Sequence, residues 1–334
     1  MVFLISILAS EVAALSRIFH LGTRKSPLAM AQSHEVARAL CDAHGWPETR
    51  VQLVPIDTKG DILLTQALSE LGGKGLFTQE LESKLLSGDL DFAVHSLKDL
   101  PTQDPNGLCV AAIPPREDAR DALILAPELK GINSLKDLPA QTKFGTASLR
   151  RQAQILRLNS NLEIGLLRGN VGTRISQLTH SIENNDGIAV TLLALAGLKR
   201  LGLSERVDMI MPIDQMLPAP GQGALAVQTR TDDAELIDLL KPLNCAITQA
   251  QVTAEREFMA RLDGSCKTPI AAYADVTDNR LTLTGRLLSL DGQECAEAEI
   301  SGSVNEAAAL GERIAQDIRN KYPELVPVSD NPEG

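Results

Sequence analysis

Residues 143–158 read KFGTASLRRQAQILRL, and this stretch indicates the fold most clearly. Its first three residues predict a short strand, the next small residues a tight turn, and residues 148–158 a helix with apolar side chains at helical spacing. Arg150 and Arg151 stand in the first turn of that helix, where the helix dipole disfavours cations. Because backbone N–H groups at a helix start bind anions, the stretch predicts an anion beside this turn. Solvated surface arginines are the alternative.

The same alternation of strands and helices continues on both sides of this stretch. Alternating strands and helices indicate α/β domains with mostly parallel sheets. The predicted strands are residues 17–23, 51–56, 91–95, 122–125, 143–145, 163–167, 188–193 and 221–229, and the predicted helices are residues 27–43, 66–87, 148–158 and 171–182.

The pattern changes after residue 241. Helices are predicted at residues 247–262 and 306–321. Between them, residues 271–274, 281–288 and 296–301 alternate like antiparallel strands. The C-terminal part therefore reads as a small α+β domain.

Length and composition narrow the class of protein. A chain of 334 residues predicts two or three domains. The formal net charge of −11 disfavours nucleic-acid binding, and an aromatic content of 3% disfavours platforms that stack single-stranded bases. The apolar residues 1–15 lack a basic start and are too short to span a bilayer comfortably, so residues 1–16 are predicted to be an extension.

The five cysteines show no C-x-x-C spacing. We therefore expect reduced thiols in a cytoplasmic protein, with neither a disulfide framework nor a zinc site. Cys266 lies in a short loop beside Lys267, and a cation next to a thiol favours a nucleophilic thiolate. An inert cysteine is the alternative reading.

Polar clusters follow several predicted strands, where α/β sheets bind their ligands. Residues 95–99 read HSLKD and combine a hydroxyl, a cation and a carboxylate; the alternative is a polar loop in which Asp99 pairs with Lys98. From Lys143 to Arg174 there are six basic residues and one acid, a local charge of +5. This segregation favours a polyanionic small molecule, because arginine binds carboxylates through paired hydrogen bonds. A solvated basic helix face is again the alternative, and residues 60–77 read best as a flexible flap.

Seven runs of residues, in this order, closely resemble the porphobilinogen deaminase family, also called hydroxymethylbilane synthases. Each run is weak alone, but seven in sequence are specific, and the likeness extends from about residue 17 into the C-terminal region. The runs are TRKSPLA (23–29), GGKGLF (72–77), HSLKD (95–99), SLRRQ (148–152), LRGNVGTR (167–174), AGLKRLG (196–202) and PGQGA (220–224).

The resemblance implies an α/β fold with three domains. Two domains like those of type II periplasmic binding proteins would enclose a central cleft, and a small C-terminal α+β domain would carry the cofactor cysteine on a loop. Residues 17–114 and 220–241 would form domain 1, residues 115–219 domain 2 and residues 242–334 domain 3. The strand after Gly221 would thus return to the first domain.

The resemblance also implies an enzyme of haem and tetrapyrrole biosynthesis. Members condense four porphobilinogen molecules head to tail, with loss of ammonia, on a dipyrromethane cofactor, and release hydroxymethylbilane. Cys266 matches the cysteine that holds this cofactor by a thioether. Asp99 matches the catalytic carboxylate, a general acid and base that also stabilises the cationic pyrrole.

Further residues match the positions of the family that bind cofactor and substrate. The implied cofactor-binding residues are Lys98, Asp99, Thr146, Ser148, Arg150, Arg151, Arg168, Gly169, Arg174 and Cys266. The implied substrate-binding residues are Arg24, Ser26, Lys74, Phe77, Arg168, Arg174, Arg200 and Gln222. No metal, nucleic acid or membrane partner is implied, and a cytoplasmic monomer is expected.

Three rival functions remain open from sequence. A non-catalytic anion-binding protein could share the two-domain fold. A regulatory ligand-binding domain and an inactive family member are the others. The first would need neither Asp99 nor Cys266, the second lacks an apparent helix-turn-helix segment, and the presence of both residues argues against the third.

Overall fold

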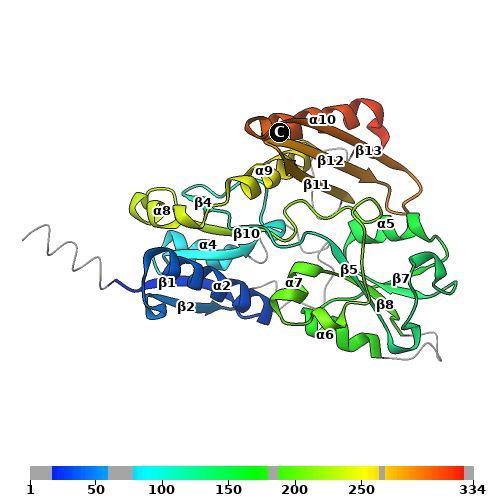
Figure 1. The fold of residues 1–334 in the computed structure, drawn as a ribbon, viewed down its shortest axis with the longest axis horizontal. Coiled ribbons are helices and arrows are strands. Elements are labelled where there is room, and N and C mark those ends of the chain that lie inside the picture. The colour runs from blue at the N-terminus through cyan, green and yellow to red at the C-terminus, as the bar shows by residue number, and fades with distance from the viewer. Residues whose placement is uncertain (1–16, 59–77, 180–186, 263–267, 327–334) are drawn as a thin grey trace, which may run out of the picture.

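The computed structural model describes residues 17–58, 78–179, 187–262 and 268–326. Within these residues the chain forms three sheets, each with its own helices (Figure 1). The first two are five-stranded and, apart from the late strand at residues 225–230, lie in the blue-to-green part of the chain; the third is three-stranded and lies near the C-terminus. In the described part of the chain, no helix combines the length and apolar character that crossing a bilayer requires.

The first sheet has the strand order β2-β1-β3-β10-β4. Strands β1, β2 and β3 are parallel, and β10 runs antiparallel to both of its neighbours. Apolar side chains from the sheet and from α2 fill a core around Leu21, Leu40 and Phe92. The elements of this unit are β1 (Phe19–Arg24), α2 (Pro27–His44), β2 (Val51–Ile56), α4 (Gln79–Leu86), β3 (Phe92–Ser96), β4 (Leu108–Ala112), β10 (Leu225–Arg230) and α8 (Ala234–Leu240).

The second sheet repeats this topology with the order β7-β6-β8-β5-β9. Strands β6, β7 and β8 are parallel, and β5 is the antiparallel strand. Its elements are β5 (Asp121–Leu125), β6 (Lys143–Gly145), α5 (Leu149–Leu158), β7 (Glu163–Gly165), α6 (Val171–Ser176), β8 (Val190–Ala194), α7 (Leu195–Arg200) and β9 (Met209–Ile210).

The chain passes twice between the two sheets. Residues 113–120 connect β4 to β5, and residues 211–224 connect β9 to β10. Each antiparallel strand is therefore the one that enters from the other sheet. This exchange confirms the predicted fold class, two α/β units of the type II periplasmic-binding-protein kind, and it confirms that the late strand returns to the first sheet.

The third sheet is an antiparallel meander that packs under two helices. Strands β11 (Ile270–Thr277), β12 (Arg280–Leu288) and β13 (Cys295–Ser303) lie against α9 (Ala246–Arg261) and α10 (Ala307–Lys321). A Cβ atom at Gly285 would lie 2.6 Å from the ring of Phe258, so glycine allows α9 to approach the sheet this closely. The predicted small α+β domain is confirmed.

Some element boundaries differ from the sequence prediction. The strand predicted at residues 221–229 begins only at Leu225, because Gly221 and Gly223 have φ angles of 74° and 89° and form a turn. The strand predicted at 163–167 ends at Gly165, and the helix predicted at 171–182 ends at Ser176. Four further elements had no predicted counterpart, namely β4, β9, α7 and α8.

Candidate active site

Asp99 lies at the end of β3, in the single 3-10 turn η2 (Leu97–Asp99). The turn is anchored by Leu97, whose side chain is buried and whose N–H donates to the Ala224 carbonyl at 3.0 Å. The Asp99 side chain is exposed, whereas Lys98 beside it is half-buried. The strand therefore delivers a carboxylate to solvent at the edge of the sheet where its parallel strands end.

Lys98 is directed toward the chain crossing between the two sheets. Its Nζ donates to Gln222 Oε1 at 3.2 Å. Burial lowers the pKa of Lys98 to about 8; Asp99 and Asp121 oppose this shift, while Arg151 and Arg150 add to it. Lys98 is therefore not part of a simple polar loop that pairs only with Asp99; it belongs to a larger network that includes Gln222.

Asp121 is the centre of that network. It is fully buried at the start of β5, and its two carboxylate oxygens pair with Arg150 at 2.9 Å and Arg151 at 2.8 Å. Gln222 Nε2 also donates to Asp121, at 3.0 Å. Burial disfavours the charge of Asp121, but the attraction of Arg150 and Arg151 outweighs it and holds the pKa of this carboxyl far below its usual range.

The start of α5 positions the arginine pair. Ser148 is the N-cap, and its Oγ accepts a hydrogen bond from the Arg151 N–H at 3.4 Å. Thr146 Oγ1 accepts from the Ser148 N–H at 3.0 Å and so shapes the preceding turn. Both arginines are 6% exposed, so the alternative of solvated surface arginines is wrong. The carboxylate of Asp121 thus supplies negative charge that offsets the unfavourable interaction of the two arginines with the helix dipole.

Arg174 brings the second sheet's basic run toward Asp99. Its Nε donates to the Gly169 carbonyl at 2.7 Å, and Gly169 has a φ of 106° that favours glycine. Burial lowers the pKa of Arg174 to about 10; Arg151 and Arg168 shift it in the same direction, and Asp99 opposes them. Arg174 therefore interacts electrostatically with both Asp99 and Arg151, although β3 and α6 belong to different α/β units.

The predicted substrate residues near the first sheet are engaged locally. Arg24 ends β1 and is half-buried, and Ser26 caps α2 by accepting from the Ala29 N–H at 3.3 Å. Arg200 lies in α7, is 8% exposed and donates from Nε to Glu35 of α2 at 2.7 Å. The Arg200–Glu35 pair connects the second unit to the first, and the predicted substrate contacts of all three residues stay predictions.

Gln222 is fully buried, with Nε2 also donating to the Ala119 carbonyl at 2.7 Å. It therefore joins both crossing segments to Lys98, and its substrate contact likewise stays a prediction. Lys74, Phe77 and Cys266 lie outside the described residues. Strand β11, which follows Cys266 in the sequence, is held against the second crossing segment, because the Ala272 N–H donates to the Pro218 carbonyl at 3.0 Å.

Sequence reasoning missed two buried acids. Asp121 is followed directly by the apolar run at residues 122–125, and this position was the one sequence signal that could have marked it. Glu255 is fully buried on α9 and accepts from Arg116 Nη1 at 2.6 Å, and its helical spacing from Val252 and Phe258 placed it on the apolar face.

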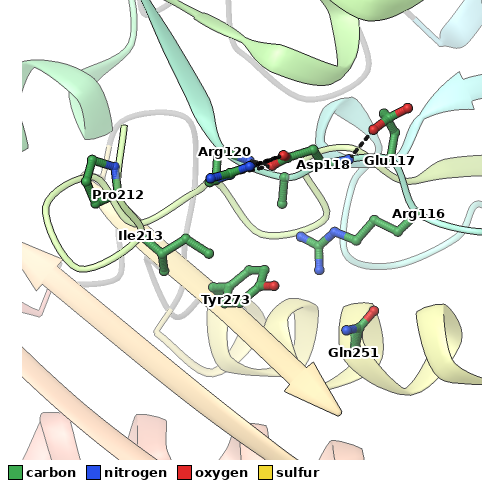
Figure 2. A pocket seen from close by; sticks show the side chains of 9 residues that line it. Arg116, Glu117, Asp118, Arg120, Pro212, Ile213, Gln251 and Tyr273 are labelled. Atoms are coloured by element: carbon green, nitrogen blue, oxygen red, sulfur yellow. Dashed lines mark hydrogen bonds and ion pairs between the residues drawn. The ribbon is translucent and has the colours of Figure 1, made fainter. Parts of the chain in front are cut away.

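Arg116 also borders a pocket where the three units meet. The pocket has a volume of about 540 Å³ and lies beside both crossing segments. Figure 2 shows Arg116 and Tyr273 across it, and the Arg116 guanidinium lies 5.5 Å from the centre of the Tyr273 ring. Since Arg116 is bound by Glu255, this junction holds the third unit against the crossings.

Fold and site together define a class: proteins with two α/β units that place a cationic cluster beside an exposed carboxylate at their sheet edges, suited to carboxylate-rich small molecules. Residues 19–238 match the family model described as porphobilinogen deaminase, dipyrromethane cofactor binding domain, and residues 249–320 match its C-terminal domain. The chain belongs to the porphobilinogen deaminase family. It is therefore an enzyme of tetrapyrrole biosynthesis with a domain that binds a dipyrromethane cofactor.

Curated relatives carry the same description along nearly their whole length. The porphobilinogen deaminase of Nitrobacter winogradskyi is 45% identical over 304 residues, which cover 91% of this chain and 93% of the relative. That of Paracoccus denitrificans is 43% identical over 304 residues, 91% of this chain and 94% of its own.

Similarity to solved structures is more distant. A periplasmic sulfonate-binding protein of Methylobacillus flagellatus is 11% identical, with a TM-score of 0.36 over 72% of this chain and 67% of that one. An arginine-specific periplasmic binding protein of Salmonella typhimurium is 13% identical, with a TM-score of 0.35 over 68% and 92%. At such low scores these two likenesses carry no argument, and the fold class rests on the strand topology above.

Proposed function

We propose that this chain condenses four porphobilinogen molecules head to tail, with loss of ammonia, and releases hydroxymethylbilane, using Asp99 as its catalytic carboxylate. One observation carries the proposal. Asp99 is an exposed carboxylate at the end of β3, and it lies in the electrostatic field of Arg174 from the other sheet and of Lys98 beside it. Acid chemistry and anion binding therefore meet at one place.

The residues present fit a cofactor that bears carboxylates. Three cations, Lys98, Arg150 and Arg151, share the single buried acid Asp121, so the cluster keeps positive charge for a ligand. Within the described residues, the buried Arg151 Nε has no hydrogen-bond acceptor. A carboxylate of a dipyrromethane would supply one. We propose that Arg168, Arg174 and the turn at Thr146, Ser148 and Gly169 complete this binding site, and that Cys266 holds the cofactor by a thioether.

When bound, the cofactor supplies the nucleophilic pyrrole to which substrate is joined. The chain's own residues then have three tasks. The arginines hold the carboxylates of substrate rings by charge-assisted hydrogen bonds and so fix the ring orientation. Asp99 gives a proton to the departing amine and later takes the proton lost from the new ring junction. While ionised, Asp99 also stabilises the positive charge that develops on the substrate pyrrole as ammonia leaves.

We also propose that the enzyme acts as a monomer. The acid at the end of β3, the arginine pair on α5 and Arg174 on α6 all come from one chain, so the cluster needs no second copy to complete it. Free thiols at Cys41, Cys109, Cys245 and Cys295 suit a reducing compartment and support a cytoplasmic location.

The domain limits are proposed on the same footing. Residues 17–114 with 220–241, residues 115–219 and residues 242–334 each contain the strands of one sheet. Residues 1–16 would be an extension before the first of these domains.

The anion-binding cluster predicts a pH dependence that tests this proposal. Burial lowers the pKa of Lys98 to about 8, so its charge is lost as the pH rises through that value. The KM for porphobilinogen is then expected to rise above about pH 8 in the unaltered enzyme. In Lys98→Arg the cation persists, so this rise should disappear. Steady-state kinetics at a series of pH values measure both, and an identical rise in the variant would contradict a binding role for Lys98.

As the pH rises, the stability of the protein should change in the opposite direction to its affinity for substrate. Unfolded chains bind the Lys98 proton up to about pH 10.4, whereas the folded chain releases it near pH 8. Between those values the unfolded state carries more protons, so the contribution of Lys98 to the free energy of unfolding rises with pH. A parallel fall in stability and affinity above pH 8 would point to general unfolding instead.

A further inference from the structure

The hairpin between β12 and β13 rests on α5, the helix that carries the arginine pair (Figure 1). Gly292 in its turn has a φ of 71°, and a Cβ atom there would lie 2.2 Å from the Ala153 carbonyl oxygen. Gln152 Nε2 donates to the Leu290 carbonyl at 3.2 Å. Backbone therefore meets backbone at this contact, and the third unit touches the second directly beside the cationic cluster.

Arg286 of β12 extends this contact inward. Its guanidinium donates to three different groups: Gln154 Oε1 at 2.6 Å, the Asp214 carbonyl at 2.9 Å and Glu297 Oε2 at 2.5 Å. The Arg286 side chain is 9% exposed, and its bond to Gln154 is buried, whereas Glu297 lies at the surface. One residue thus connects the third unit to α5 and to the second crossing segment.

Gln154 passes the contact on to Arg150. It is 1% exposed, and its Oε1 also accepts from the Leu217 N–H at 2.9 Å. Its Nε2 donates to the Leu217 carbonyl at 3.0 Å, and that same carbonyl accepts from Arg150 Nη1 at 2.8 Å. Gln154 therefore holds the Leu217 backbone at both its N–H and its carbonyl. That carbonyl orients Arg150, and Arg286 helps to hold Gln154 in place.

We propose that Arg286 is a positioning residue for the reaction: through Gln154 and Leu217 it holds Arg150 in the orientation that binds anionic pyrrole rings. The inference rests on the proposed anion-binding role of Arg150. It gives the third unit a task at the anion-binding cluster, because a residue of β12 then helps to orient an arginine of α5. Small displacements of such groups have large effects on binding and rate.

Arg286→Met is the informative substitution. Methionine keeps much of the aliphatic stem, Gln154 Oε1 keeps its bond from Leu217, and Glu297 and Asp214 can bind water because both are exposed. The variant is therefore expected to fold and to load its cofactor. Arg280→Met, on the same strand but exposed, is the matched control.

The expected result is a KM for porphobilinogen raised about tenfold in Arg286→Met, with kcat changed by less than about threefold. Arg286→Lys should recover part of the loss, since lysine keeps a cationic donor but cannot bind three acceptors in a plane. In an Arg150→Lys background, Arg286→Met should add little further increase, because both changes act on one group. Melting temperature and intact mass report folding and cofactor loading separately.

The outcomes separate the two proposals. If Arg150→Lys alone leaves KM and cofactor loading unchanged, the anion-binding role of Arg150 is wrong, and the inference built on it falls too. If Arg150→Lys raises KM but Arg286→Met matches Arg280→Met, only the positioning role is overturned. Fully additive effects in the double variant would also overturn it.

Discussion

Asp99→Asn is expected to lower the turnover number by about 10²- to 10⁴-fold, the range that a positioned general acid and base contributes. Asparagine keeps the size of the side chain and can still accept a hydrogen bond, but it can neither exchange the proton nor offset positive charge on the substrate. Because Asp99 is exposed at the end of β3, the fold should be unaffected. Initial rates with porphobilinogen give the turnover number, and a thermal melt checks the fold.

A matched control is available close by. Asp89 is an exposed acid shortly before β3 and pairs only loosely with Lys84, at 3.6 Å. Asp89→Asn should leave turnover nearly unchanged, which shows that the effect belongs to the position and not to a lost surface charge. Near-normal turnover in Asp99→Asn, with the cofactor present, would rule out the catalytic role.

Asp121→Asn is expected to destabilise the protein by about 3–5 kcal/mol, the usual cost of removing one partner from a buried ion pair. Two guanidiniums, from Arg150 and Arg151, would remain buried side by side without their carboxylate. Since Gln222 and Lys98 belong to the same network, cofactor loading should fall as well. Urea unfolding at neutral pH measures the stability loss directly.

Asp118→Asn provides the comparison for that experiment. Asp118 lies three residues before Asp121 and pairs with Arg120 at 2.6 Å, but the Arg120 side chain is 40% exposed. Ion pairs open to solvent contribute about 0–1 kcal/mol, so this change should be small. Equal stability losses in the two variants would mean that the buried pairing around Asp121 has no special importance.

Local patterns predicted much of the fold, because strand and helix periodicity is written in neighbouring residues. Residues 51–56 and 143–145 were predicted with the bounds that the strands have. The return of the chain to the first sheet was not written in local patterns and was implied only by the family resemblance. The start of β10 was misplaced because an apolar run cannot show where the turn at Gly221 and Gly223 ends.

The site was predictable in part for the same reason. Asp99, Arg150 and Arg174 follow strands, so their gathering at the sheet edges could be expected. Their partners could not, because Asp121 meets Arg151 across 30 residues and Gln154 meets Arg286 across 132. Sequence showed two arginines where the helix dipole disfavours them, and only the fold revealed that a buried aspartate of the chain offsets them.

The central claim is that this enzyme joins pyrroles while a dipyrromethane is bound covalently to Cys266. Its most direct test is the intact mass of the purified chain under denaturing conditions, with Cys266→Ser as the control. We expect an excess mass equal to two linked pyrrole units in the unaltered chain and the bare polypeptide mass in the variant. A bare mass in both, persisting after incubation with porphobilinogen, or an equal excess in both, would contradict the claim.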